Sequence, residues 1–556
     1  MDNTAFEIIS SYEEFKIESS PDVEDIVLFR FAERRFAYLC PDREKPSSVG
    51  IIFALDDATF DQPHILLYEI DYAGSSSLPQ GKYRGVCLYE SGSVIYSLMS
   101  YEEKIIDAVE RLIDLLTLSP LQKEKEFQKE FLFYWNAAAQ PGKREIYLNN
   151  SKDFSTLSVY QSSDCTRYIA PLTKLNDLDF MRDGNRTWQQ RIDTTAIYLP
   201  IIDNRGILPP LKNRPWKKEQ IVEILCSDVS NHISLESFRQ LGAMQIKYDT
   251  LDIVFEMAVM QVPYRFLARI TFRGGHGESL LERITNHIHS VEILQSKNMD
   301  YCYLNQIIGN STSNFGKKVL LIGAGSLGSY VASELVKNGF SDMTIYDGDD
   351  LSSENFMRWF YSGIFKDGNK ASQLGLYLQL MHPEIHIDSH KENIDDSKLI
   401  NEIASADYII FTVGSSDTQL RLNRILKENR CSAKVLYAWL EAGGQHSHIL
   451  KIDYSIPGCF ECLFTDEAGN MVNNQANITA DEIIELNTIR NGCGATRAAY
   501  GTSVLLRTTS VLLDVLRKEE LDTSLGNYLV NISPDSVVYD EGSFAKEVCH
   551  CCGNQT

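Results

Sequence analysis

The sequence lacks several features that would place the protein in a specialised class. No stretch approaches about 18 apolar residues without a charge, so no membrane span is expected. There is no internal repeat and no low-complexity tract. Positive charge is scarce, because 53 Lys and Arg face 76 Asp and Glu and leave a formal charge of −23. This balance argues against a protein that coats nucleic acid, since phosphate contacts need a basic surface.

The beginning of the chain also lacks a secretory signature. The first residues, MDNTAFEIISSYEEF, contain neither a basic region nor a long apolar region. We therefore expect a soluble, cytoplasmic protein in a reducing compartment. The 12 cysteines are notable for their placement, with one close pair and one cluster near the end of the chain. In such a compartment cysteines more often bind metal or act as nucleophiles than form disulfides.

The 556 residues are enough for three domains, which we predict at 1–140, 145–300 and 301–556. The first block has three β-type runs followed by an amphipathic helix, which predicts an α+β domain. These elements are expected at Ile26–Phe31, Val49–Leu55, His64–Ile70 and Tyr101–Leu116. The middle block mixes strands such as Thr194–Ile202 with helices such as Lys218–Leu225 and carries no motif with evident chemistry. It is predicted to be α/β, and 310–316 to be a short linker.

The third block contains a glycine-rich turn in the setting that binds nucleotides. A buried-strand pattern at Lys317–Ile322 is followed by Gly323, Gly325 and Gly328 and then by a helix pattern. These glycines permit a tight turn and let phosphates approach the backbone at a helix N-terminus. Asp347 ends the next strand, 19 residues after Gly328, where a carboxylate can accept both ribose hydroxyls. The competing interpretation is a tight turn that binds nothing, and the glycines alone would also suit NAD.

The residues after Asp347 distinguish ATP from NAD. Asn355 and Arg358 follow in the segment DGDDLSSENFMR, Lys370 lies in DGNKASQLG, and Asp417 follows another buried strand. Over about residues 315 to 510 this spacing resembles the ThiF/MoeB and ubiquitin-activating adenylation superfamily. The resemblance implies a Rossmann-like fold, ATP and Mg²⁺. It also implies that Asp347 holds the ribose, that Asn355, Arg358 and Lys370 serve the phosphates, and that Asp417 helps to hold Mg²⁺.

Adenylation explains why cationic groups are needed here. A carboxylate that attacks the α-phosphate of ATP brings two anions together, and Arg358, Lys370 and Mg²⁺ would offset their repulsion. Each basic side chain by itself is equally compatible with a solvated surface charge. The chain departs from the superfamily at Asn305, where an arginine that acts across a dimer is usual. The resemblance implies a homodimer, and Asn305 puts completion of the site across subunits in doubt.

Two C-x-x-C pairs predict a metal site. Cys459 and Cys462 form the first pair, and Cys549 and Cys552 form the second. Four thiolates suit tetrahedral Zn²⁺ with no open position, so this site would be structural. His550 and Cys551 are alternative ligands near the second pair. The competing interpretation is reduced cysteines without metal.

Two further cysteines are candidate carriers of an activated carboxyl group. Cys493 lies in the glycine-flanked segment NGCGATR, ahead of a helix predicted from Ala498 onward. A helix N-terminus and Arg497 would both lower the pKa of the thiol. The activating enzymes carry their thioester-forming cysteine in a comparable position. The competing interpretation is a small buried residue.

Cys87 is the second candidate carrier. The segment YRGVCLYESGSVIYSL, followed by a long helix, resembles the active-site stretch of ubiquitin-conjugating enzymes. The upstream His-Pro-Asn element of that family is missing, so no donor for the thioester oxyanion can be named. An ordinary core cysteine in a strand is the competing interpretation, and Cys40 is a weaker candidate.

The order of the three blocks resembles the bacterial CBASS-associated fusion of a ubiquitin-conjugating-like and a ubiquitin-activating-like domain. That resemblance implies adenylation of a protein's C-terminal carboxylate, with a cGAS/DncV-like nucleotidyltransferase as the expected partner. The carboxyl group would pass to Cys493, then to Cys87, and finally to an amine of a target in anti-phage defence. Two alternatives remain open, a sulfur-carrier adenylyltransferase of the thiamine or molybdopterin type and a non-enzymatic nucleotide-binding scaffold. An NAD-linked dehydrogenase is more remote.

Overall fold

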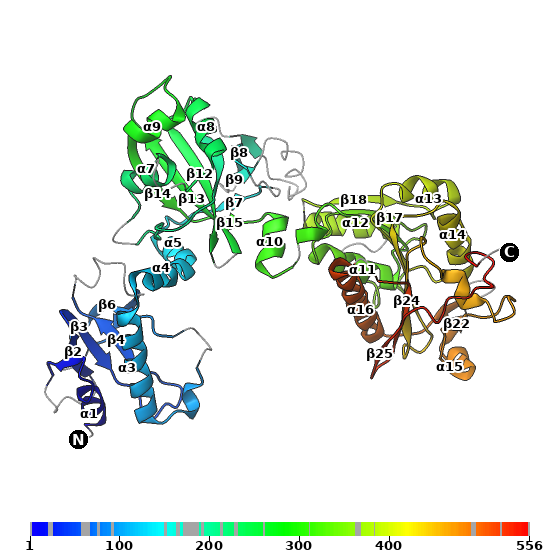
Figure 1. The fold of residues 1–556 in the computed structure, drawn as a ribbon, viewed down its shortest axis with the longest axis horizontal. Coiled ribbons are helices and arrows are strands. Elements are labelled where there is room, and N and C mark those ends of the chain that lie inside the picture. The colour runs from blue at the N-terminus through cyan, green and yellow to red at the C-terminus, as the bar shows by residue number, and fades with distance from the viewer. Residues whose placement is uncertain are drawn as a thin grey trace. The chain divides into compact units, whose positions relative to one another are not determined.

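The computed structural model describes most of the chain, and all statements below concern the described residues. These are 3–19, 26–56, 67–74, 78–89, 94–148, 153–162, 167–170, 188–190, 194–211, 215–226, 232–259, 262–310, 312–361, 368–382, 384–490, 496–522 and 525–553. The chain divides into two compact units. The helices and strands of both units are labelled in Figure 1. Unit 1 comprises Met1–Lys143, Asp153–Thr156 and Ile192–Ser296, and unit 2 comprises Arg144–Lys152, Leu157–Arg191 and Lys297–Thr556.

The first part of unit 1 is an antiparallel sheet covered by helices on one face. The strand order is β1-β2-β3-β4-β6-β5. Helices α1 and α3 pack their apolar side chains against one face of this sheet, and α3 begins at a capping box in which Ser100 and Glu103 bond reciprocally. The bounds are α1 Thr4–Ser10, β1 Phe15–Ile17, β2 Ile26–Phe31, β3 Arg34–Leu39, β4 Ile51–Ala54, β5 Leu67–Tyr72, β6 Gly81–Val86, η1 Tyr96–Leu98 and α3 Tyr101–Thr117.

The second part of unit 1 is built around a long hairpin. Strands β12 and β13 pair antiparallel, β11 is parallel to β12, and β14 pairs with β13. Aromatic side chains of α5 join this core, where Trp135 lies edge-on against Trp216 with ring centroids 5.2 Å apart. The bounds are α4 Pro120–Lys129, α5 Phe131–Ala138, β11 Thr195–Ile201, α7 Lys218–Cys226, α8 Leu235–Ala243, β12 Thr250–Val259, β13 Val262–Phe272, α9 Leu280–Asn286 and β14 Ile288–Leu294.

Unit 2 contains an open sheet with helices on both faces, which positions the nucleotide-site candidates. The strand order is β18-β17-β16-β19-β20-β21-β24-β25, parallel from β18 to β20 and antiparallel thereafter. Helices α11, α12 and α16 contribute to the core on one face, and α13, α14 and η5 to the core on the other. This alternation of strand and helix is the Rossmann-type arrangement.

From residue 301 onward, the elements of unit 2 have the following bounds: α10 Tyr301–Ile307, η4 Thr312–Asn314, β16 Lys318–Ile322, α11 Ser326–Lys337, β17 Asp342–Tyr346, α12 Lys370–Met381, β18 His386–His390, α13 Asp396–Ile403, β19 Tyr408–Phe411, α14 Ser416–Glu428, β20 Lys434–Leu440, β21 Ser447–Ile452, η5 Phe460–Phe464, α15 Asp481–Leu486, β22 Thr488–Arg490, β23 Thr496–Ala498, α16 Thr502–Leu521, β24 Tyr528–Ile532 and β25 Val537–Asp540. Strands β22 and β23 form a separate two-stranded sheet. Shorter strands elsewhere are β7 Arg144–Ile146, β8 Ser155–Ser162, β9 Arg167–Ala170, β10 Trp188–Gln190 and β15 Lys297–Asn298.

The predicted helix from Ala498 onward is wrong at its start. Residues Thr496–Ala498 form β23, which pairs antiparallel with β22, and α16 begins at Thr502 after the extended residue Gly501. Pairing with β22 satisfies the backbone groups of Thr496–Ala498, so these residues do not extend the helix. The segment predicted as a linker at 310–316 contains the short helix η4. In the described part of the chain, no helix combines the length and apolar character that a membrane crossing requires.

Candidate nucleotide site and cysteine cluster

The glycine-rich turn joins β16 to α11, at the point where the strand order reverses between β16 and β19. Gly323 has a φ of +103°, and a Cβ there would lie 3.0 Å from a methyl group of Val413. A Cβ on Gly328 would lie 2.0 Å from the carbonyl oxygen of Gly323 and 2.6 Å from Oγ1 of Thr412. Gly325 precedes α11 and has open space around it. Two glycines therefore allow the turn to close, and the third leaves room for a ligand at the helix N-terminus.

Asp347 is held next to this turn at the carboxyl end of β17. Its Oδ2 accepts a hydrogen bond from the amide of Ala324 at 2.7 Å, and its Oδ1 accepts one from the amide of Asp349 at 2.9 Å. Burial raises the pKa of Asp347 above its usual 3.8, although these amides and nearby Lys370 favour the ionised form. A partly desolvated carboxylate fixed in this way is a suitable acceptor for hydroxyl groups.

Lys370 reaches the same site through an ion pair that the sequence analysis did not identify. Its buried Nζ lies 2.8 Å from Oδ2 of Asp349, whose side chain is 73% exposed. Asn369 caps α12 by accepting from the amide of Ser372, and its Nδ2 donates to the carbonyl of Asp347 at 2.7 Å. Asp349, two residues after Asp347, and Asn369, directly before the lysine, were the available sequence signals, but only the fold shows that they tie Lys370 to Asp347.

Asn355 and Arg358 lie in the loop that follows β17. Asn355 is buried, and its Oδ1 accepts from both the amide and the hydroxyl of Ser352, so it fixes the loop. A terminal nitrogen of Arg358 donates to the carbonyl oxygen of Ala498 at 3.2 Å, and its guanidinium lies 5.2 Å from the ring centre of Tyr500. The Nε of Arg358 is buried without a hydrogen-bond partner in the described structure.

Asp417 and Asn305 are the remaining residues that the sequence singled out near the nucleotide site. Asp417 is exposed in the first turn of α14, which follows β19 and is capped by Ser415. Asn305 is buried in α10, where its Nδ2 donates to the carbonyl of Tyr301 and its Oδ1 accepts from Asn310. The side chain that replaces the usual arginine is therefore used within its own segment.

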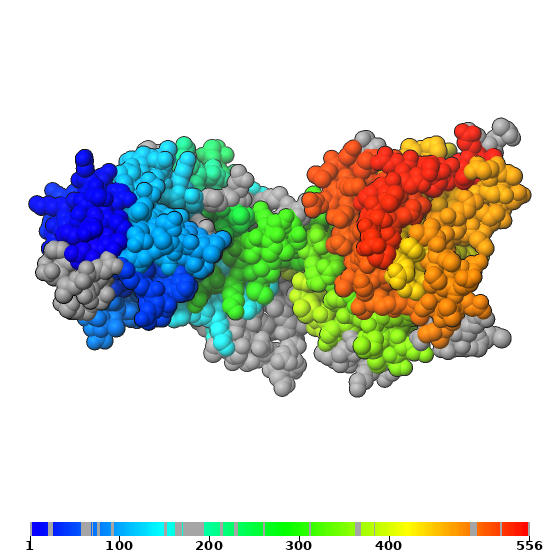
Figure 2. Space-filling model, turned by 90° about the horizontal axis from the view of Figure 1, so that it is seen from below, coloured from blue at the N-terminus to red at the C-terminus, as the bar shows by residue number. Residues whose placement is uncertain are grey.

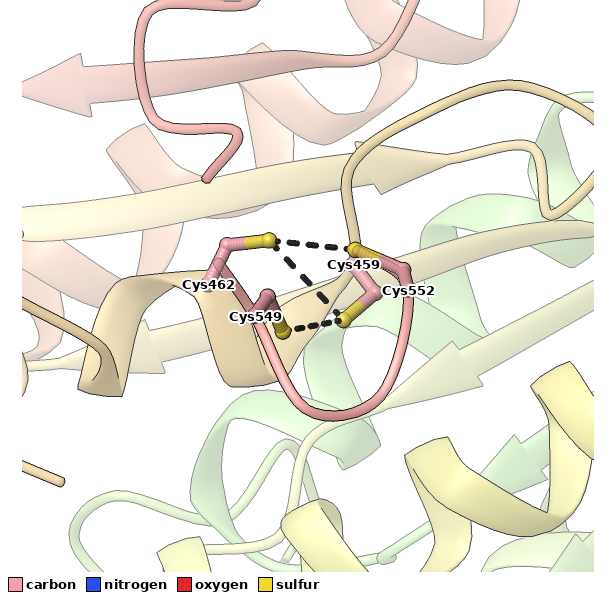
Figure 3. Close-up of side chains that lie close together, drawn as sticks. All are labelled: Cys459, Cys462, Cys549 and Cys552. Atoms are coloured by element: carbon pink, nitrogen blue, oxygen red, sulfur yellow. Dashed lines mark hydrogen bonds between the residues drawn. The ribbon is translucent and has the colours of Figure 1, made fainter. Parts of the chain in front are cut away.

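The four cysteines of the two C-x-x-C pairs come together in unit 2. Their sulfur atoms all lie within 4.8 Å of one another, and they point toward a common centre (Figure 3). Cys459 lies 4.0 Å from Cys462 and 3.8 Å from Cys549, and Cys462 lies 3.3 Å from Cys552. Zn–S bonds of about 2.3 Å in a tetrahedron imply sulfur separations of roughly 3.8 Å, so the arrangement fits a Cys₄ zinc site.

The neighbouring alternatives have other partners. His550 lies within hydrogen-bond distance of the carbonyl of Gly469, and Cys551 accepts from Nδ2 of Asn423 at 3.3 Å. Phe544 of the C-terminal segment shares a core with Phe460, and in the space-filling view this segment (red) runs beside residues coloured orange (Figure 2). The cluster thus joins the end of the chain to the segment after β21.

Of the two candidate thiols, the structure describes Cys87 but not Cys493. Cys493 lies outside the described residues, between β22 and β23. Cys87 is half-buried directly after β6, and it packs against Phe127 and Tyr134. A cavity of ≈ 470 Å³ opens beside it. The cavity's polar and charged lining includes Tyr89, Arg111, Asp114, Glu126, Lys129 and Glu130.

Comparison with known proteins agrees with the fold of unit 2. Residues 313–534 match the ThiF family. This segment is a ThiF family domain. The matched range contains the glycine turn, the residues from Asp347 to Asp417 and the first C-x-x-C pair.

Curated relatives match only part of the chain. Ubiquitin-like modifier-activating enzyme 5 of Drosophila virilis is 23% identical over 162 residues, which are 26% of this chain and 39% of that protein. The uncharacterized protein y4oA of Sinorhizobium fredii is 24% identical over 163 residues, 26% of this chain and 27% of that protein. The chain therefore spans well under half of the length of these relatives. A crystal structure of E. coli MccB covers 44% of this chain and 67% of its own, with 18% identity and a TM-score of 0.34.

Proposed function

We propose that the ThiF domain uses ATP to adenylate the C-terminal carboxylate of a protein. The observation that carries this proposal is the grouping of Asp347, Asp349 and Lys370 beside a glycine turn that leaves a helix N-terminus open. Helix amides and a lysine suit phosphates, and a fixed carboxylate suits ribose hydroxyls. The match to the ThiF family supports the same reading.

In the proposed reaction, a carboxylate oxygen of the protein tail attacks the α-phosphorus of ATP. The new P–O bond forms as the bond to the pyrophosphate oxygen breaks, and pyrophosphate leaves with the electron pair. Asp347 would hold the ribose, while Asn355, Arg358 and Lys370 would orient the phosphates and offset their charge. Mg²⁺, held with the help of Asp417, would supply further charge neutralisation.

The acyl adenylate would then be passed between thiols. The Cys493 thiolate would attack the acyl carbon and release AMP, and Cys87 would displace Cys493 to form a second thioester. An amine of the target would finally attack that thioester, forming an amide and releasing the Cys87 thiol. The cavity beside Cys87 supports this last role, because it leaves space next to the sulfur for an incoming group.

The wider setting of the proposal rests on the resemblance to the CBASS-associated fusion. The N-terminal part of unit 1 would be a ubiquitin-conjugating-like domain, and the protein would work as a homodimer in the cytoplasm. The partner would be a cGAS/DncV-like nucleotidyltransferase with a free C-terminal carboxylate, conjugated to a target lysine or other amine. Zn²⁺ at Cys459, Cys462, Cys549 and Cys552 would be structural. A sulfur-carrier adenylyltransferase would share the first step but would not need Cys87.

Two assays test the successive steps. ATP–pyrophosphate exchange in the presence of Mg²⁺ and the partner tests adenylation, and its absence would overturn the proposed function. Reducing and non-reducing gels then follow the adducts. We expect the first thiol-sensitive adduct to be lost in Cys493→Ala, and Cys87→Ala to trap it on Cys493. Cys40→Ala is the matched control, and unchanged conjugation in Cys87→Ala would rule out the role of Cys87.

A further inference from the structure

Helix α14 connects the nucleotide site to the cysteine cluster. Its first turn carries Asp417, directly after the carboxyl end of β19, and its later turns face the segment that contains Cys459 and Cys462. Asp417 and Asn423 are six residues apart, which corresponds to about 9 Å along a helix. Whatever fixes the later turns therefore also fixes the place of Asp417.

Asn423 is completely buried, and its side chain bonds to the 454–462 segment and to Cys551 near the end of the chain. Its Oδ1 accepts from the amide of Phe460 at 3.0 Å and from the hydroxyl of Tyr454 at 2.9 Å. Its Nδ2 lies 3.7 Å from the sulfur of Cys459 and 3.3 Å from that of Cys551. Thiolate sulfur is a better acceptor than a neutral thiol, so the bond from Nδ2 to Cys459 would strengthen if Cys459 ligated a metal ion.

Arg424 makes the second connection. It forms a two-pronged ion pair with Glu461, with nitrogen–oxygen distances of 2.6 and 3.0 Å. The Glu461 side chain is 0% exposed and lies between Cys459 and Cys462 in the sequence, so this ion pair supplies the partner that a buried carboxylate needs. Lys427, one turn further on, donates to the carbonyl of Tyr454 at 3.1 Å. Three residues of one helix therefore bind a single short segment. Asn423 accepts from a backbone amide and a tyrosine hydroxyl, Arg424 pairs with a buried carboxylate, and Lys427 donates to a backbone carbonyl.

We propose that the cysteine cluster positions the nucleotide site, and that Asn423 and Arg424 are the positioning residues. The metal would hold the 454–462 segment against α14 and thereby hold Asp417 where Mg²⁺ is bound. This inference rests on the proposed function for the role of Asp417, but the mechanical link between the cluster and the first turn of α14 does not. It goes beyond a structural zinc, because it assigns the metal an effect on Mg²⁺ use at another site.

The first test compares the zinc-loaded full-length protein with protein stripped by a chelator and with protein reloaded with Zn²⁺. Hydrogen–deuterium exchange of residues 413–420, without nucleotide, should rise on stripping and return on reloading. The Mg²⁺ concentration at half-maximal ATP binding should rise by about tenfold, the lower end of what outer-shell groups contribute at metal sites. Equal exchange in the loaded and stripped proteins would overturn the proposal.

A second test does not depend on a stripped protein that stays folded. The double variant Arg424→Met with Glu461→Leu replaces the ion pair by apolar groups and should keep one equivalent of zinc. We expect a Mg²⁺ midpoint about three- to tenfold higher than in the wild type, with the exchange of 413–420 raised. Arg421→Met is the matched control, since Arg421 is on the same helix but pairs with exposed Asp396. A double variant indistinguishable from this control would refute the link.

The two proposals fail in different ways. If stripping changes the exchange of 413–420 but no form of the protein binds Mg²⁺ and ATP, the proposed function is wrong and the link through α14 stands. If ATP binds with the same Mg²⁺ midpoint with and without zinc, the proposed function stands and the positioning role is wrong. A role limited to stability would lower the amount of folded protein without moving the Mg²⁺ midpoint of the folded fraction.

Discussion

Arg358 donates to the carbonyl oxygen of Ala498 at 3.2 Å, which joins the nucleotide-site loop to strand β23. Ala498 pairs with Thr488 at the open end of β22 and β23, the two strands that flank the Cys493 segment in the sequence. Tyr500, two residues further on, places its ring 5.2 Å from the same guanidinium. A residue proposed to serve the phosphates is thus also bonded to the segment proposed to receive the acyl group.

Replacement of Arg358 should therefore affect chemistry more than folding. We expect Arg358→Gln to lower the rate of ATP–pyrophosphate exchange by about 10²- to 10³-fold, as loss of a charge-stabilising donor does in other active sites. The unfolding free energy should change by only about 1–3 kcal/mol, the cost of leaving one carbonyl unpaired. Lys391→Gln, an exposed substitution after β18, is the control. Unchanged exchange kinetics in Arg358→Gln would contradict the assigned role.

Alanine substitutions at Gly328 and Gly325 should affect different properties, the stability of the fold and the affinity for ATP. Gly328→Ala would place a methyl group 2.0 Å from the carbonyl oxygen of Gly323, so we expect a loss of about 1–3 kcal/mol in urea unfolding. Gly325→Ala meets nothing within 4 Å and should fold as well as the wild type. Its added methyl group faces the proposed phosphate space and should weaken ATP binding. Equal stability of the two variants would show that the packing argument is wrong.

The pH dependence of nucleotide binding should report on Asp347. Burial raises its pKa above 3.8, so the carboxylate takes up a proton at a higher pH than an exposed aspartate does. The protonated acid is a poorer acceptor for ribose hydroxyls, so ATP affinity should fall as the pH is lowered from about 7 toward the raised pKa. Calorimetric titration of Asp347→Asn should show weaker binding without this acid limb. A wild-type affinity that stays constant to the acid limit of folding would contradict the prediction.

Adjacent cysteines provide a sharp test of the metal site. Cys552→Ser removes a sulfur of the cluster and should abolish stoichiometric zinc, with a loss of several kcal/mol of stability because metal binding is coupled to folding. Cys551→Ser replaces a sulfur outside the four and should retain about one equivalent. Metal analysis and thermal unfolding of the two proteins check this. Zinc lost equally from both, or absent from the wild type, would refute the assignment.

The sequence by itself determined the features that depend on local pattern. The glycine turn follows from a buried strand, three spaced glycines and an amphipathic helix, and β2 matches its predicted bounds of Ile26–Phe31. The C-x-x-C pairs specified which thiols belong together, because a three-residue spacing brings two sulfur atoms to one side of a turn.

Only the tertiary structure decided the long-range relationships. The ion pair of Asp349 with Lys370, the bond from Arg358 to Ala498 and the approach of the second C-x-x-C pair to the first join residues from separate elements. The start of α16 at Thr502 was missed because strand pairing with β22 competes with helix for the same backbone groups. The hydrophobic periodicity of a segment indicates which face of that helix or strand is buried. The contacts above depend on which elements pack against one another, and periodicity does not specify that.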